Sequence, residues 1–98
     1  MASVGKTTIA ASGTTTFSPS THNTLKGLQT STYHTISITG SGTATIEFKH
    51  MDQDNFVSVA TGVSGDFDTY ECRYVSEIKI TETGGANSID VAINSYEE

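Results

Sequence analysis

The chain has 98 residues, of which 35% are hydrophobic and none is tryptophan, and this length suits a single domain with one modest core. Its net charge of −6 argues against a nucleic-acid partner, because phosphate contacts need clustered Lys and Arg. No apolar run approaches the roughly 18 residues of a membrane helix, and the first six residues lack the apolar core of a signal peptide. We therefore expect a protein made and kept in a cytoplasm, with no membrane partner.

The first part of the chain, residues 1–32, is rich in Ser, Thr and Gly. Two short β segments are predicted here, Thr7–Ala11 and Thr14–Phe17, separated by a Ser-Gly turn. Pro19 ends the pairing, so Ser18–Thr24 is expected to be a loop. The segment is therefore either the first part of the main fold with a long connection or an extended N-terminal arm.

Alternating strands dominate the rest of the chain. Six are predicted: Thr32–Thr39, Thr43–Lys49, Asn55–Ala60, Thr69–Val75, Glu77–Thr83 and Ser88–Asn94. Glycines at Gly40–Gly42 and Gly84–Gly85 supply the positive φ of tight turns, so residues 36–48 and 78–91 are predicted to form two similar hairpins. Each hairpin has one apolar face, and the two faces are best buried against each other. The predicted fold is one all-β domain over residues 1–98, a small antiparallel sandwich of about six to eight strands.

Charge is distributed unevenly along the chain. All eleven acidic residues lie from Glu47 onward, so the first 46 residues carry +2 and the remainder carries −8. This pattern has two interpretations: ordinary solubility of an acidic body, or an acid-free part that lies on another subunit. We expect residues 1–32 to carry much of the intersubunit contact. The first glycine turn is uncharged and the second follows Glu82, so docking is expected on the side of the first turn.

Candidate ligand sites are few. The segment Gly5–Thr8 imitates the end of a phosphate-binding loop, but that loop needs an earlier glycine, a preceding strand and a following helix, so no nucleotide site is expected. The loops predicted at 52–55 and 62–66 bring several carboxylates, which calcium favours, although aspartate also occurs in turns because it bonds to its own backbone. Four aspartates are candidates to gather at one end of the sandwich: Asp52, Asp54, Asp66 and Asp68.

Histidine and cysteine give no metal or disulfide pattern. The spacings between His22, His34 and His50 match no compact zinc site, and His34 is in phase with the apolar residues of its strand. The single cysteine, Cys72, cannot form an intrachain disulfide. It is in phase with Tyr70 and Tyr74, which predicts a core position for all three. We expect no metal and no cofactor.

Nothing in the sequence predicts catalysis. There is no Gly-x-Ser-x-Gly elbow, and a sandwich of this size has little volume for the deep cleft that paired carboxylates need. We therefore predict that the chain is not an enzyme and has no catalytic residues. A carbohydrate-binding platform would need exposed aromatic residues on one sheet, and the absence of tryptophan counts against it.

Several segments together carry a resemblance to a known group: the Thr-rich start 7–17, the strand 32–39, the strand entry Ser41–Phe48, the acidic turn into Tyr70–Tyr74 and the closing segment 84–94. They resemble the small β-sandwich accessory virion proteins of tailed bacteriophages, of the capsid decoration or cement type. The resemblance implies a homo-oligomer, expected to be a trimer, that bridges subunits of the major capsid protein or another virion protein. It implies location in the virion after synthesis in the host cytoplasm. The alternatives are a tail, head–tail or fibre component, or a non-viral glycan- or protein-binding module.

Overall fold

The computed structural model describes residues 2–18, 33–50, 54–70 and 75–96, and all of the regular structure in them is β. The eight strands are β1 (Ala2–Ile9), β2 (Thr14–Phe17), β3 (Tyr33–Gly40), β4 (Ala44–His50), β5 (Val57–Val63), β6 (Asp66–Tyr70), β7 (Val75–Glu82) and β8 (Ile89–Tyr96). In these ranges no helix is long and apolar enough to cross a membrane. The predicted all-β class is confirmed.

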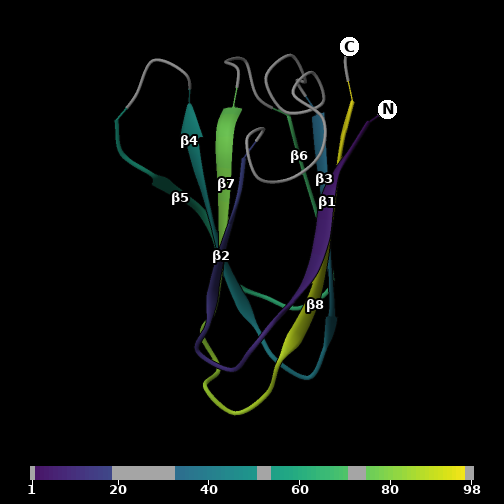
Figure 1. Cartoon of the computed structure of the whole chain (residues 1–98), viewed down its shortest axis with the longest axis vertical. Coiled ribbons are helices and arrows are strands. Elements are labelled where there is room, and N and C mark those ends of the chain that lie inside the picture. Colours follow the sequence, from purple (N-terminus) through teal and green to yellow (C-terminus); the bar gives the residue numbers. More distant parts are fainter. Residues whose placement is uncertain (1, 19–32, 51–53, 71–74, 97–98) are drawn as a thin grey trace.

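The strands form two antiparallel four-stranded sheets that pack face to face (Figure 1). Sheet A has the order β1-β8-β3-β6 and sheet B has the order β2-β7-β4-β5. Strands 1 and 8, 2 and 7, 3 and 6, and 4 and 5 are therefore neighbours. This is the topology of an eight-stranded jelly roll, in which one long antiparallel ribbon is rolled into two layers. The predicted antiparallel sandwich is confirmed, and its topology is now defined.

The two predicted hairpins are wrong, because each glycine turn joins strands of different sheets. The residues after β3 lead the chain from sheet A to β4 in sheet B, and those after β7 lead it back to β8 in sheet A. The two similar segments pair with each other instead, β3 with β8 and β4 with β7. Alternation gives both arrangements the same apolar faces, so periodicity does not distinguish a hairpin from an arch between layers.

Strand boundaries agree with the predictions to within two residues except at β1, at the end of β5 and at β6. β1 begins at Ala2 and ends at Ile9. Residues 10 and 11, predicted as strand, instead belong to a turn in which Gly13 N donates to Ala10 O (2.8 Å). The strand predicted at Thr69–Val75 overlaps β6, Asp66–Tyr70, at residues 69–70, while residues 71–74 lie outside the described ranges and Val75 begins β7. β5 ends at Val63 and not at the predicted Ala60, so part of the predicted loop 62–66 belongs to β5 and β6. The predicted core positions of Cys72, Tyr74 and the Tyr70 side chain lie outside the described part of the molecule.

Residues 2–17 belong to the sandwich and are not an arm. β1 pairs along its length with β8, and β2 pairs with β7. Ile9 and Phe17 are 2% and 0% exposed and belong to the core. Residues 19–32, the rest of the expected arm, lie outside the described ranges. Deleting residues 1–20 to test for contact with a partner would therefore remove β1 and β2. A loss of binding in that variant would not be distinguishable from a loss of folding.

The core between the sheets is built from buried residues of six strands, β1, β2, β3, β4, β7 and β8. Most of its members are isoleucines, which suit a half-buried pleated surface. The buried hydrophobic residues are Ile9, Phe17, Ile36, Ile38, Ala44, Ile46, Phe48, Val75, Ile78, Ile80, Ile89, Val91 and Ile93. Two histidines flank Phe48, with ring centroids 5.5 Å away for His34 and 6.5 Å for His50, both edge to face. Phe48 is fully buried near the end of β4, and it connects the isoleucines of the core to these two rings.

Candidate docking surface

Four connections between the sheets meet at one end of the molecule, which we call the arch end. They are residues 10–13 between β1 and β2, 41–43 between β3 and β4, 64–65 between β5 and β6, and 83–88 between β7 and β8. The arch end lies at the bottom of Figure 1, and both chain termini lie at the opposite end. The odd-numbered strands run towards this end and the even-numbered strands run away from it, so all four connections from an odd-numbered strand to the next strand lie here.

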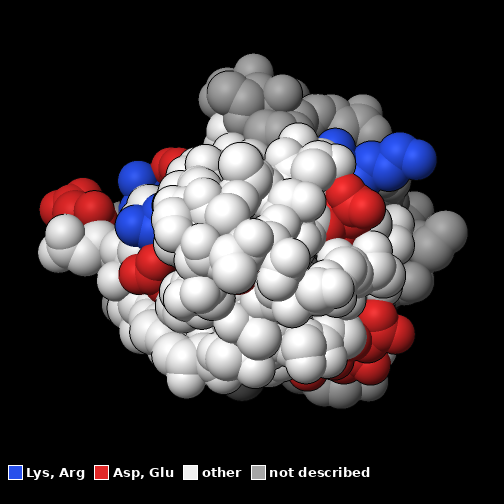
Figure 2. All heavy atoms as spheres, turned by 90° about the horizontal axis from the view of Figure 1, so that it is seen from below, with Lys and Arg blue, Asp and Glu red and all other residues white. Residues whose placement is uncertain are grey.

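The exposed residues of the four connections, and Gly40 at the end of β3, are small and uncharged, while the exposed Asp66 follows the third connection at the start of β6. The small, uncharged residues are Ala10, Ala11, Ser12, Gly40, Ser41, Ser64, Thr83, Gly84, Gly85, Ala86, Asn87 and Ser88. Figure 2 looks onto this end and shows a broad uncharged centre, with acidic and basic side chains at its rim. The chain has a net charge of −6, but the exposed residues at the centre of this surface carry no charge.

One buried carboxylate holds three of the four arches together. Glu82 is only 1% exposed and accepts four backbone N–H groups. Its Oε1 accepts from Ser12 (3.0 Å) and Gly85 (2.8 Å), and its Oε2 accepts from Thr43 (3.1 Å) and Gly84 (2.8 Å). A buried charge with this many donors is compensated, because hydrogen bonds to an ionised group replace those of water. Glu82 therefore fixes the shape of the arch end from within.

The same contacts hold the pKa of Glu82 at about 2, against an ordinary value of 4.5. The amide of Ser12 contributes most, followed by that of Gly85, while burial acts in the opposite direction and the amides of Gly84 and Thr43 lower the pKa further. Donors that point at the ionised form stabilise it relative to the neutral form. Glu82 is therefore a carboxylate throughout the pH range in which proteins usually work.

Two glycines make the space in which this carboxylate lies. A Cβ on Gly42 would lie 2.7 Å from Glu82 Oε2 and 2.8 Å from Ile89 Cγ2, and a Cβ on Gly84 would lie 2.8 Å from Glu82 Oε2. Real Cβ atoms do not approach other atoms so closely. The Gly42 and Gly84 positions therefore require glycine because the carboxylate occupies the volume of a side chain, independently of any turn geometry.

An open groove of about 520 Å³ lies on the outer face of sheet A. It crosses β1, β8 and β3, and its polar lining includes Lys6, Thr8, Ser37, Thr39 and Asp90. The Thr8 hydroxyl donates to Asp90 Oδ1. The groove offers both donors and acceptors, and none of its lining residues is aromatic.

The aspartates considered for calcium do not come together. Asp54 follows β4 at the end opposite the arch end, whereas Asp66 begins β6 at the arch end. Asp66 accepts a hydrogen bond from Ser37 Oγ (2.6 Å), and Asp68 follows two residues later on the same strand. Asp52 lies outside the described residues. In the described ranges there is no group of three or more His, Cys, Asp or Glu arranged to hold a metal ion.

The other sequence candidates have structural positions. The segment Gly5–Thr8, considered for phosphate, lies inside β1 and pairs with β8, so it forms no loop. His34 and His50 are buried beside Phe48, and His34 Nδ1 lies 2.8 Å from Ser95 Oγ. His22 lies outside the described part of the chain. His34 and His50 are therefore core residues.

The buried position of Glu82 was not predicted, although the pattern of its strand indicates it. Glu82 is in phase with Ile78 and Ile80, and alternation therefore points its side chain inward. A charge at an inward position next to a glycine turn indicates buried N–H donors, since an uncompensated charge would be too costly there. The expectation that an acid distinguishes the second turn is also wrong: the charge is buried, and both arches expose neutral residues.

Comparison with models of protein families finds none that matches this chain, and a search of curated proteins finds no significant match either.

Proposed function

We propose that this protein is a bacteriophage virion structural protein, a capsid decoration or cement protein that stabilises the head by bridging subunits of the major capsid protein. The observation that carries the proposal is the uncharged arch end, braced from within by Glu82. Small neutral residues on a fixed backbone dock at low cost, because little side-chain entropy is lost and no charge is desolvated. Jelly rolls are common in viral capsid proteins, although fold alone does not define function.

A charge placed on the arch end tests this proposal. Ala86 is exposed in the 83–88 arch, and Ala86→Arg adds a long cation without touching the core. We expect this variant to bind heads that lack the protein about tenfold more weakly than wild type, because the guanidinium must be desolvated at the contact. Co-sedimentation of the purified protein with such heads measures the bound fraction.

The matched control is Asn55→Arg, an exposed position at the opposite end of the sandwich. It adds the same side chain and is expected to bind heads like wild type. Equal melting temperatures for the three proteins establish that the fold is intact. Wild-type binding by the arch variant, or a lack of binding by the unmodified protein, contradicts the proposal.

A second candidate, a glycan-binding module, is favoured by the groove on sheet A. Its hydroxyls, together with Lys6 and Asp90, match the donors and acceptors of a sugar. If this candidate holds, a glycan array probed with the purified chain gives a binder whose affinity falls at least tenfold in Asp90→Ala, since a carboxylate that accepts two sugar hydroxyls contributes strongly. An array with no binder argues against it.

A further inference from the structure

The two lateral edges of the sandwich carry opposite charge. One edge is formed by β1 and β2 and the other by β5 and β6, because these strands end the two sheets on the same sides. Residues 2–17 contain Lys6 and no acid, whereas residues 54–70 contain Asp54, Asp66 and Asp68 and no Lys or Arg. All four of these side chains are exposed. We call the two sides the basic edge and the acidic edge.

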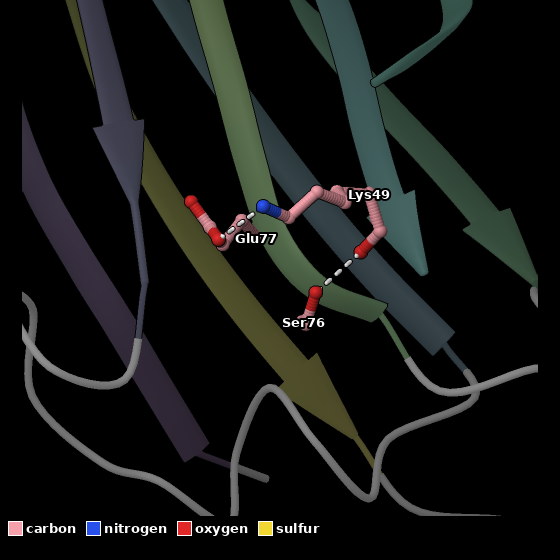
Figure 3. A network of polar contacts seen from close by, with 3 residues as sticks. All are labelled: Lys49, Ser76 and Glu77. Carbon is pink, nitrogen blue, oxygen red and sulfur yellow. Dashed lines mark hydrogen bonds and ion pairs between the residues drawn. The ribbon is translucent and has the colours of Figure 1, made fainter. Parts of the chain in front are cut away.

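By contrast, the charged side chains on the outer face of β4 and β7, the central strands of sheet B, pair with each other. Lys49 Nζ lies 2.9 Å from Glu77 Oε2, and Lys79 Nζ lies 3.6 Å from Glu47 Oε1, each pair directly across β4 and β7. Figure 3 shows the first pair and the Ser76 hydroxyl, which donates to the Lys49 carbonyl (2.9 Å). Both lysines also lie near the Phe56 ring, at 5.5 and 4.5 Å.

The charges at the edges have no such partners within the described ranges. Lys6, Asp54 and Asp68 make no ion pair there, and Asp66 accepts only from Ser37. Lys6 and Asp66 also lie in one row across sheet A, because Lys6 pairs with Ala92, Ala92 with Ser37, and Ser37 with Asp66. Opposite unpaired charges therefore end the same row of the same sheet.

The acidic edge also exposes apolar surface. Val57 in β5 is 46% exposed, and it is the one large hydrophobic side chain exposed to this degree among the described residues. Val59, Ala60 and Val63 on the same strand are only partly covered. The pairing of β5 with β4 is interrupted by two register shifts, at Ala44/Ile46 and Ile46/Glu47. Open apolar edge strands tend to pair with another chain unless something covers them.

We propose that the acidic edge of one copy packs against the basic edge of the next, so that the protein forms a closed ring. A contact of the acidic edge with itself would oppose three aspartates to three, which disfavours a two-fold dimer through that edge. A head-to-tail contact instead opposes Asp66 and Asp68 to Lys6 and covers Val57. Such contacts are heterologous, and they close into cyclic oligomers when the rotation permits. This inference concerns copies of this chain and does not depend on the proposed function.

Charge reversal tests the contact. Lys6→Glu is expected to weaken self-association at least tenfold in sedimentation equilibrium, because it opposes like charges across the contact. Adding Asp66→Lys to the same chain restores an opposite pair and is expected to recover most of the association. Association of the wild type also weakens as salt is raised, since exposed charges are screened.

The control is Lys79→Glu, which makes the same change of charge on a central strand. It is expected to leave the association of copies unchanged. A wild-type chain that is monomeric at about 1 mM, where even weak contacts are populated, overturns the proposal. So does an equal loss in Lys6→Glu and Lys79→Glu, which would mean that net charge alone acts. Head binding through the arch end is measured separately, so failure here leaves that test intact.

Discussion

Glu82→Gln is expected to lower the melting temperature at neutral pH by about 10 °C, a large effect for a domain of this size. Glutamine keeps the length of the side chain but presents an NH2 group where an oxygen now accepts two amides. Two hydrogen bonds are lost, and buried N–H donors of two arches are left facing a donor. Thermal unfolding followed by circular dichroism measures the change.

The loss should depend on pH in a defined direction. Because the pKa of Glu82 is about 2 in the folded protein and near 4.5 without these contacts, the folded state is favoured by the ionised carboxylate above the higher value. That contribution fades as the pH falls from about 5 towards 2. The gap in melting temperature between wild type and Glu82→Gln should therefore be widest at neutral pH and narrow towards pH 2.

Glu77→Gln is the matched control, since Glu77 lies on the same strand but is partly exposed and, among the described residues, forms its ion pair with Lys49. Surface ion pairs contribute about 0–1 kcal/mol, so its melting temperature should change by a few degrees at most. A constant gap between wild type and Glu82→Gln from pH 7 to pH 2 would contradict the role given to the ionised carboxylate.

Phe48→Ala is expected to cost about 3–5 kcal/mol of unfolding free energy, the usual range for a fully buried phenylalanine. Phe48 is 0% exposed and lies between the isoleucines of the core and the rings of His34 and His50. Its removal leaves a cavity and also ends both ring contacts. Urea denaturation at neutral pH gives the free energy.

Phe56→Ala supplies the comparison with the same chemistry at the surface. Phe56 is partly exposed and lies near the ammonium groups of Lys49 and Lys79. Such cation–π contacts are worth about 0.5–1 kcal/mol each at exposed sites, so the total loss should stay well below that of Phe48→Ala. Similar losses of unfolding free energy in the two variants would contradict the role of Phe48 as a core residue.

The sequence predicts the strands better than their connections. The apolar residues at alternate positions of β3, β4, β7 and β8 indicate strands with one buried face, and β2 is found at the predicted Thr14–Phe17. Alternation reports only which residues point inward, and it is the same for a hairpin and for an arch between layers. The strand order depends instead on which edges pair, and that is a long-range property.

The candidate docking surface was harder to predict for a related reason. Gly42 and Gly84 look like ordinary turn glycines, but the space beside both is filled by the carboxylate of Glu82, the last residue of β7. The acid-free start of the chain did indicate a surface with little charge. It did not indicate that residues 83–88, inside the acidic half of the sequence, would complete that surface at the same end of the fold.

The position of the termini has a consequence for engineering. Ala2 lies opposite Ser95 on adjacent strands, at the far end of the sandwich from the arch end. A peptide or reporter fused to either terminus would leave the molecule at the end opposite the arches. The same proximity makes a short linker between the two ends sufficient for a circularly permuted chain, with new termini at the exposed tip of the 83–88 arch.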